Sequence, residues 1–292
     1  KLITDSAAGA TAFASGIKTY NGAIGVQPNK KPSPTILEEA ELNNKATGMV
    51  STSTIVHATP AAFIAHQESR AMYEEIAADF LTTDIDVFIG GGKKYFDRRD
   101  SDNRNLYQEL THKGYLVKDY FYSSLSDIKV IPNQKIAYFT SDEDPLPVSQ
   151  GRNYLQTASH LAIDQLSNNS KEGFFLMIEG SQIDWGGHAN NSDYIITEML
   201  EFDKVIGSVL DWAIKDKNTL VIVTADHETG GYAINGGSMG DLQTAFTSTY
   251  HTAELIPVFA HGPGSAAFRG IYENTAIYNK MRTAFKFDKA NP

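Results

Sequence analysis

Two nearly continuous apolar runs, separated by one long amphipathic segment, constrain the fold of this chain more than any other feature. The runs cover residues 173–178 and 219–224. Such runs are typical of parallel strands that are buried on both faces of a sheet. Between them, residues 192–215 repeat apolar side chains at helical spacing, beginning with Ile195 and Met199. A strand, a helix and a second strand in this order indicate an α/β fold.

The same alternation continues through the rest of the sequence. Further strands are expected at 47–53, 86–89, 115–117, 135–139 and 255–260, and further helices at 6–16, 36–44, 61–70, 71–81, 105–112, 153–166 and 275–285. Pro257 indicates an edge or a bulge, because proline lacks the N–H that a strand ladder needs. We therefore predict one domain, residues 1–292, with a three-layer α/β/α sandwich on a mostly parallel central sheet. Glu198 and Glu201 are expected to be charges on the outer side of their helix.

Composition limits the classes of function. The formal net charge of -10 argues against a nucleic-acid partner, which would normally require a basic surface. The chain has no cysteine, so a metal site would have to use His, Asp, Glu, Ser or Thr. No apolar run approaches the ~18 residues of a membrane span, so we expect no membrane association through such a helix.

The opening segment joins a short apolar stretch to an alanine-rich helix through Thr4, Asp5 and Ser6. Ser6 is therefore expected at a helix N-terminus, where free N–H groups and the helix dipole favour an oxyanion or a phosphate. Taken alone, the segment is better explained by a helix cap at Asp5 or Ser6.

Chemically active side chains follow the predicted strands at the edge where α/β proteins bind ligands. They are Glu179, Asp184 and His188 after one apolar run, Asp226 and His227 after the other, His57, Thr59 and Arg70 after strand 47–53, and His251 before strand 255–260. Aspartate with histidine suits zinc in an open catalytic site, whereas glutamate with threonine suits magnesium. Two metals about 4 Å apart can hold both oxygens of an in-line phosphoryl displacement.

Each of these pieces has a simpler explanation when it is taken alone. The simpler explanations are a surface pair for Asp184 and His188, a strand-end turn for Asp226 and His227, a cap for Thr59 just before Pro60 at a first helical position, and a solvated helix end for Arg70. These explanations become less convincing when the residues are considered together, because unrelated caps and surface pairs have no reason to gather at strand ends.

Several motifs resemble signatures of the alkaline phosphatases. Residues 4–12 and 16–26 resemble the nucleophile signature of that family. The other matching motifs are 57–61, 69–70, 179–184, 224–230 and 251–252, so the resemblance covers nearly the whole chain. The combination of His57 with Trp185 resembles certain cold-adapted and marine bacterial members of the family.

The resemblance implies hydrolysis of phosphate monoesters through a covalent phosphoserine at alkaline pH. Ser6 would be the nucleophile, Arg70 would bind the phosphate, and His57 and Trp185 would lie beside the substrate. The family also implies two Zn²⁺ and one Mg²⁺ per subunit, a homodimer, and a periplasmic or secreted location. The implied ligands are Asp184, His188 and His251 for the first zinc, Asp226, His227 and Ser6 for the second, and Thr59 and Glu179 for magnesium, with His57 where some members have aspartate.

One family feature is absent from this sequence. Members carry an aspartate in a Gly-Asp-Gly segment on their first strand, and it contacts the second zinc and the magnesium. We expect one ligand and one central strand to be missing, and a Gly-Asp-Gly strand upstream of Lys1 would supply both. The alternative functions are a phosphodiesterase or sulfatase-like metal hydrolase of the same superfamily, or an inactive metal- or phosphate-binding module.

Overall fold

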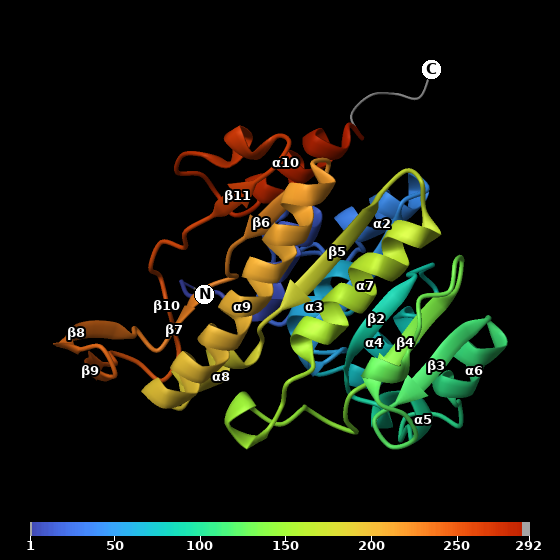
Figure 1. The fold of residues 1–292 in the computed structure, drawn as a ribbon, viewed down its shortest axis with the longest axis horizontal. Coiled ribbons are helices and arrows are strands. Elements are labelled where there is room, and N and C mark those ends of the chain that lie inside the picture. Colours follow the sequence, from blue (N-terminus) through green and yellow to red (C-terminus); the bar gives the residue numbers. More distant parts are fainter. Residues whose placement is uncertain (1, 288–292) are drawn as a thin grey trace.

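A five-stranded parallel sheet forms the middle layer of the computed structural model, which describes residues 2–287 (Figure 1). The strand order is β3-β4-β2-β1-β5, and all four neighbouring pairs are parallel. The strands are β1 (Ala46–Thr54), β2 (Val87–Gly91), β3 (Tyr115–Asp119), β4 (Lys135–Phe139) and β5 (Phe174–Glu179). Their carboxyl ends therefore meet at one edge of the sheet.

Helices cover both faces of this sheet (Figure 1). One face carries α7 (Leu155–Asn169) and α9 (Ser192–Asp216), and the other carries α1 (Ser6–Ser15), α2 (Ile36–Leu42), α3 (Ala58–Ile64), α4 (Tyr73–Asp79), α5 (Lys94–Asp97), α6 (Leu106–His112) and α10 (Ala276–Phe285). Successive residues of β1 enter different cores, because Met49 packs with the α3 side and Val50 with the α7 side. The predicted α/β/α architecture is confirmed.

The two apolar runs were predicted to form parallel strands buried on both faces of a sheet, and the structure differs from this prediction for both. In the part of the chain that the structure describes, β5 pairs with β1 alone and stands at the edge of the sheet. The second run forms only β6 (Val221–Val223), which pairs antiparallel with β11 (Phe259–His261) in a separate ladder. Both strands are mostly half-buried, because a strand edge without a neighbour remains accessible to solvent. Pro257 lies outside β11, which begins two residues later.

Two helix predictions also need correction. His57 is the N-cap of α3, so Pro60 occupies the third helical position instead of the first. This position tolerates proline because the first N–H groups of a helix have no partner within the helix. The helix ends at Ile64, so Arg70 lies in an irregular segment before α4.

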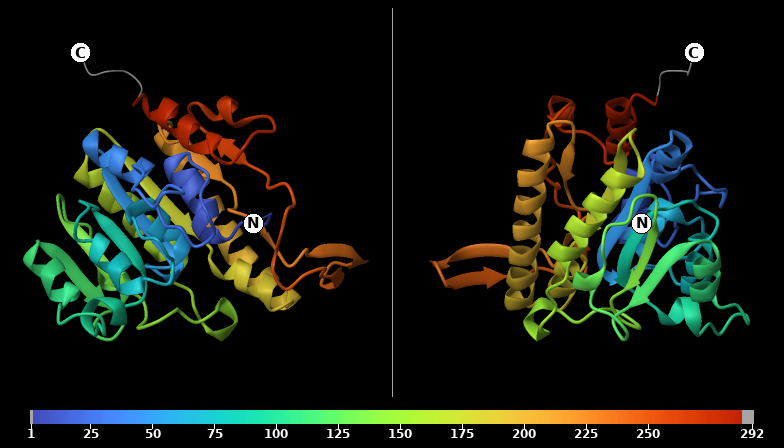
Figure 2. Two further views of the ribbon diagram at one scale, coloured as in Figure 1. Left: turned by 180° about the vertical axis from the view of Figure 1, so that it is seen from behind. Right: turned by 45° about the vertical axis from the view of Figure 1, so that its right-hand side comes forward.

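Several short elements lie outside the predicted pattern. They are α8 (Gln182–His188), the pair β7 (Glu228–Thr229) and β10 (His251–Thr252), the hairpin β8 (Ala233–Ser238) with β9 (Asp241–Ala245), and the 3₁₀ turns 125–127, 148–150 and 265–268. The hairpin extends away from the body of the molecule (Figure 2). None of the described helices is both long and apolar enough to cross a membrane.

Glu198 and Glu201 are not outer charges. Glu198 is 2% exposed, and both carboxylates pair with the guanidinium of Arg152. Glu198 also accepts a hydrogen bond of 2.8 Å from the N–H of Val148. Burial of a charge requires such partners. The ion pairs attach the long loop at 140–152 to α9.

Candidate active site

Helix α1 presents Ser6 at its first turn without using it as a cap. Asp5 is the N-cap, and its Oδ1 accepts a hydrogen bond of 3.0 Å from the N–H of Ala8. Ser6 is buried, and its Oγ lies 3.0 Å from Nε2 of His227. The simple cap explanation therefore holds for Asp5 and leaves the Ser6 hydroxyl available for chemistry.

The turn after β6 packs directly against α1. A Cβ on Gly9 would lie 3.0 Å from the carbonyl oxygen of Asp226, so only glycine allows this approach without displacement. Asp226 Oδ2 is 3.1 Å from His227 Nε2, and it is buried without a hydrogen bond among the described residues. Asp226, His227 and Ser6 thus converge as one group of donor atoms.

A second group combines Asp184 and His188 of α8 with His251 of β10. Their ligand atoms all lie within 4.8 Å of one another. Nε2 of each histidine is 3.5 Å from Asp184 Oδ1, and the two Nε2 atoms are 3.1 Å apart. The two groups adjoin, because the rings of His227 and His251 stack with centroids 3.4 Å apart.

The protonation of these rings follows from their other hydrogen bonds. Nδ1 of His188 lies 2.8 Å from the carbonyl of Thr249, and Nδ1 of His251 lies 2.8 Å from the carbonyl of Thr4. A carbonyl only accepts, so each Nδ1 carries a hydrogen, and in the neutral tautomer Nε2 presents a lone pair. Two lone pairs and a carboxylate that face one another call for a cation, and this donor set suits zinc.

Thr229, a residue that sequence reasoning missed, connects the two groups. Its hydroxyl donates to Asp184 Oδ1 and accepts from Nδ1 of His227 at 3.2 Å. The second bond places a hydrogen on Nδ1 of His227, so in the neutral tautomer Nε2 carries the lone pair that faces Ser6. The available signal was the spacing of His227 and Thr229, since residues two apart in an extended segment point to the same side.

A third group lies where β5 and α3 meet. Glu179 ends β5, and burial together with the charges of Asp226 and Asp184 raises its pKa to about 7. The Ser181 hydroxyl donates to Glu179 Oε2 at 2.6 Å, and the Thr59 hydroxyl also bonds this carboxylate. Carboxylate and hydroxyl oxygens are ligands that magnesium accepts.

His57 stands between this group and Arg70. Burial and the nearby Arg70 guanidinium lower the pKa of His57 to about 4, which favours the neutral ring. Its Nδ1 is buried without a hydrogen bond in the described chain, and its ring meets Trp185 edge to face at 6.1 Å. Because the Arg70 guanidinium can only donate, and lies 3.3 Å from His57 Nε2, the hydrogen of the neutral ring lies on Nδ1, and the lone pair that could bind a metal lies on Nε2.

Arg70 is held in place by the same aspartate that caps α1. Asp5 Oδ2 lies 3.3 Å from Arg70 Nη1, and Nη2 of that arginine lies 3.3 Å from His57 Nε2. The backbone N–H of Arg70 also donates to Gly22 at 2.7 Å. Asp5 thereby aligns the helix that carries Ser6 with a guanidinium, a role that the sequence analysis did not assign.

Contacts join most of the predicted site residues at the carboxyl edge of the sheet, whereas Glu179 and Thr59 bond each other and interact with the rest through the charges of Asp226 and Asp184. Such an arrangement can bind cations with its carboxylates and imidazoles and an anion with its guanidinium and helix N-terminus. The Ser6 hydroxyl lies at this helix N-terminus and beside His227 of the second group of donor atoms.

Comparisons with known proteins agree with this chemistry. A family model described as alkaline phosphatase matches residues 1–245. Alkaline phosphatase 4 of Bacillus subtilis (strain 168) is 35% identical, with 98% of this chain and 77% of that protein covered. The structure of alkaline phosphatase from the Antarctic bacterium TAB5 matches with a TM-score of 0.92 and 45% identity, covering 99% of this chain and 86% of that one. A TAB5 variant with one histidine replaced by aspartate has Mg bound in its M3 site, and it matches with a TM-score of 0.91, 44% identity and coverage of 98% and 85%.

Proposed function

The chain belongs to the alkaline phosphatase family of phosphate monoester hydrolases, and on this premise we propose that Ser6 forms a covalent phosphoserine during hydrolysis at alkaline pH. The observation that carries the proposal is the position of the Ser6 hydroxyl. It lies at the N-terminus of α1, 3.0 Å from His227 Nε2 and beside the converging donor atoms of Asp226 and His227. This environment favours the alkoxide form, which is the attacking species.

The metal complement that we propose is two Zn²⁺ and one Mg²⁺. Asp184, His188 and His251 would hold one zinc, and the other would be held by the group that contains Ser6. The ligands proposed for magnesium are Thr59 and Glu179 with His57 beside them. When bound, the ions supply Lewis acidity that stabilises alkoxide oxygens and activates water.

The residues of the chain carry out the other steps of the proposed reaction. The Ser6 oxygen attacks phosphorus, the bond to the alcohol oxygen breaks, and the alcohol leaves with a proton. Arg70 binds two of the non-reacting phosphate oxygens and stabilises their charge in the transition state. Water then attacks phosphorus, which releases phosphate and returns the serine. Trp185 and His57 border the place where the substrate would lie.

Replacement of Ser6 by alanine tests the covalent step. We expect Ser6→Ala, supplied with zinc and magnesium, to lose at least about a thousandfold in turnover of 4-nitrophenyl phosphate. Mass spectrometry of the acid-quenched wild-type enzyme should find the phosphoryl group on the peptide that contains Ser6. Near-native turnover by the variant, or phosphorylation elsewhere, would disprove the proposal.

Substrate class is tested by comparing three esters that share the 4-nitrophenolate leaving group on one enzyme preparation. We expect 4-nitrophenyl phosphate to react at least about a hundredfold faster than bis(4-nitrophenyl) phosphate or 4-nitrophenyl sulfate. A faster diester or sulfate reaction would favour the phosphodiesterase or sulfatase-like alternative. A plot of turnover against pH whose maximum lies below pH 7 would contradict the proposed alkaline optimum.

The family membership also supports three proposals about the setting of the enzyme. We infer that residues 1–292 form one catalytic domain, that the protein is a homodimer, and that it acts in the periplasm or after secretion. Sedimentation velocity tests the dimer, limited proteolysis tests the single domain, and cell fractionation tests the location. A monomer, two independently stable fragments or a cytoplasmic pool would contradict them in turn.

A further inference from the structure

Two histidines of the adjoining zinc groups are held next to each other by a ladder only two residues long. Strands β7 and β10 pair antiparallel, with Thr229 opposite His251 and Glu228 opposite Thr252. His227 immediately precedes β7, and its ring stacks on that of His251 with centroids 3.4 Å apart. A two-stranded ladder is marginally stable even when it is longer, so the register of this one needs support from side chains.

The half-buried side chain of Glu228 provides such support. Its Oε2 accepts a hydrogen bond from the hydroxyl of Thr252, directly across the ladder. Oε2 also accepts from the N–H of Gly231 at 3.0 Å, and Oε1 accepts from the N–H of Tyr232 at 3.1 Å. An ionised carboxylate accepts at both oxygens, so this one side chain binds both β10 and the turn that follows β7.

Glu228 lies on the side of the ladder that faces away from the metal ligands. Successive residues of a strand point to opposite sides, so Glu228 points away from His227 and Thr229. The side of His227 and Thr229 is the one on which the Thr229 hydroxyl bonds Asp184. The Glu228 carboxylate and the Thr252 hydroxyl meet on the other side. Glu228 is therefore not placed to bind the metal, and it acts on the metal groups through the two strands.

The register of the ladder decides where the His251 ring lies. The rings of His227 and Tyr250 both stack on it, with centroids at 3.4 Å and 4.4 Å and interplanar angles of 15° and 12°. Two rings cannot occupy one face of an imidazole at these distances, so the His251 ring lies between them. A shift of one residue would turn His251 to the other side of the ladder, away from Asp184. His251 can therefore serve as a ligand only in the observed register.

From these contacts we propose that Glu228 is a positioning residue, whose carboxylate sets the register of β7 and β10 and with it the separation of the two proposed zinc ions. This role rests on the proposed function, because it takes the metal complement from there. Two metals hold the attacking and leaving oxygens at a spacing of about 4 Å. Loss of the Glu228 hydrogen bonds should therefore weaken zinc binding, and it should also slow turnover when zinc is saturating.

Replacement of Glu228 by glutamine tests this role. Glutamine has the same shape, but its NH₂ group donates, and all three partners of the Glu228 carboxylate are donors. We expect the dissociation constant for zinc, measured on the whole protein by competition with a chelator, to rise about tenfold or more. The visible absorption spectrum of the Co²⁺-loaded protein should change, because it reports the arrangement of the ligands. A merely structural residue would lower the thermal midpoint of the metal-free protein and leave this spectrum unchanged.

Two further variants separate the hydrogen bond from the charge. Thr252→Val removes the bond across the ladder and retains the Glu228 carboxylate, so it should also weaken zinc binding and change the Co²⁺ spectrum. The double variant with Glu228→Gln should bind zinc no more weakly than Glu228→Gln alone, because both substitutions remove the same bond. Thr252→Ser retains the hydroxyl and should recover the wild-type spectrum.

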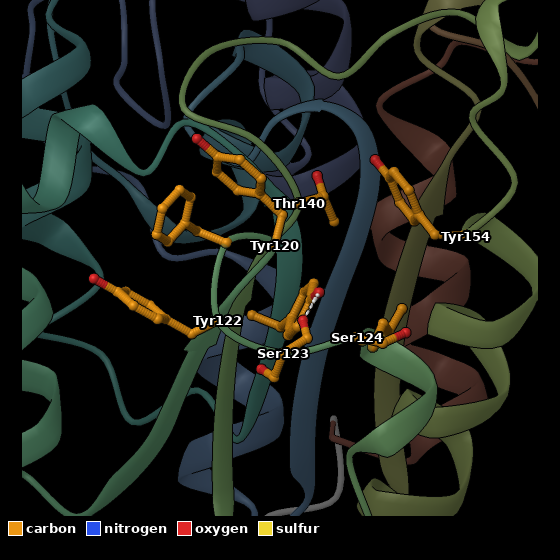
Figure 3. Close-up of a pocket in the computed structure, with 9 residues that line it drawn as sticks. Tyr120, Tyr122, Ser123, Ser124, Thr140 and Tyr154 are labelled. Carbon is orange, nitrogen blue, oxygen red and sulfur yellow. Dashed lines mark hydrogen bonds between the residues drawn. The ribbon is translucent and has the colours of Figure 1, made fainter.

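Two control variants should leave zinc binding unchanged. Glu254→Gln removes the same charge from an exposed position two residues beyond Thr252. Tyr122→Ala removes a ring that is 79% exposed in a hollow at the ends of β3 and β4 (Figure 3). These two strands lie at the opposite end of the sheet from β5. Zinc binding that is weakened as much by Glu254→Gln as by Glu228→Gln would overturn the role of the hydrogen bond.

The remaining outcomes separate this role from the proposed function. Unchanged zinc affinity and an unchanged Co²⁺ spectrum in Glu228→Gln would overturn the positioning role alone, because zinc binding by the wild type would leave the proposed function intact. Additive losses of zinc affinity in the double variant would also overturn it. A wild type that binds no zinc would overturn the proposed metal complement together with the positioning role.

Discussion

At the scale of single residues, one hydroxyl, that of Thr229, contacts side chains of both proposed zinc groups. Its hydroxyl bonds Asp184 in one proposed zinc group and His227 in the other. Thr229→Val keeps the shape of the side chain and removes both bonds. We expect zinc affinity and turnover of 4-nitrophenyl phosphate to fall about 10- to 100-fold, as is common when a partner of a metal ligand is lost. Zinc content after dialysis, measured by mass spectrometry, provides a readout independent of activity.

A matched pair of variants separates this effect from a general loss of stability. Thr229→Ser retains the hydroxyl, so its zinc content and turnover should stay within a few-fold of the wild type. Thr244 lies on the surface hairpin, and its hydroxyl is 2.7 Å from that of Ser192 at the start of α9. Thr244→Val removes this hydrogen bond and should change neither zinc content nor turnover. Full zinc retention by Thr229→Val would show that the connection between the groups is dispensable.

His66 gives a pH-dependent contribution to stability. Its Nε2 lies 2.8 Å from a Glu38 oxygen, and its Nδ1 lies 2.7 Å from the carbonyl of Gly25. Only the protonated ring can donate both bonds. Burial lowers the pKa of His66, but the Glu38 and Gly25 hydrogen bonds and the charges of Glu38 and Asp79 outweigh it and raise the pKa overall.

The direction of the pH effect follows from this raised pKa. The contribution of His66 is fully present below the unfolded pKa of about 6.5 and is lost as pH rises through the higher folded pKa. The lowered pKa of Glu38 keeps its carboxylate charged at pH 6 and at pH 9. His66→Gln should therefore reduce the free energy of unfolding by about 1 kcal/mol more at pH 6 than at pH 9. Urea unfolding of both proteins at the two pH values measures this, and an equal loss at both would contradict it.

At the scale of elements, α8 is placed by close contacts that only glycine permits. A Cβ on Gly187 would lie 2.7 Å from the Thr229 carbonyl oxygen and 2.8 Å from its Cβ. A Cβ on Gly186 would lie 2.8 Å from the backbone nitrogen of Ile195 in α9. The helix that carries Asp184 and His188 is therefore set directly between β7 and α9.

Alanine at two helical glycines should have opposite effects. Gly207 in α9 has nothing within 4 Å of an added Cβ, so Gly207→Ala should stabilise the protein by up to about 1 kcal/mol through helix propensity. Gly187→Ala should cost about 1–3 kcal/mol through overpacking and should lower turnover, because it displaces Thr229. Thermal unfolding and 4-nitrophenyl phosphate assays check both. Equal stability and activity of the two variants would refute the role of close packing at α8.

At the scale of the whole molecule, local pattern predicted the architecture better than the position of each strand. Helix α2 carries a complete capping box between Thr35 and Glu38, so its start was readable from the sequence. The edge position of β5 was not, because it depends on which strands lie beside it. The hairpin at 233–245 is exposed nearly throughout, so it offers no alternation of buried and exposed residues to detect.

In the candidate site too, some features could be predicted from the sequence and others could not. The residue types and their strand-end positions indicated which side chains would lie near one another, and most of them are in contact in the structure. The bond between Thr229 and Asp184 spans 45 residues, and the contact between Asp5 and Arg70 spans 65. Such pairings depend on tertiary distances, which one sequence does not contain. Motifs thus suggested the ligand atoms, whereas the residues that orient them required coordinates.

Removal of metal should destabilise the whole molecule as well as stop its chemistry. Nε2 of His188, Nε2 of His251 and Oδ1 of Asp184 lie 3.1–3.5 Å from one another, so one cation would contact all three atoms. These groups come from α8 and β10, so a bound ion ties together segments distant in sequence. At free zinc a thousandfold above its dissociation constant, the ion should add about 4 kcal/mol to the free energy of unfolding. Dialysis against a chelator should therefore lower both the thermal midpoint and the turnover, and added zinc should restore both. An unchanged midpoint after verified zinc removal would show that these residues do not hold a structural cation.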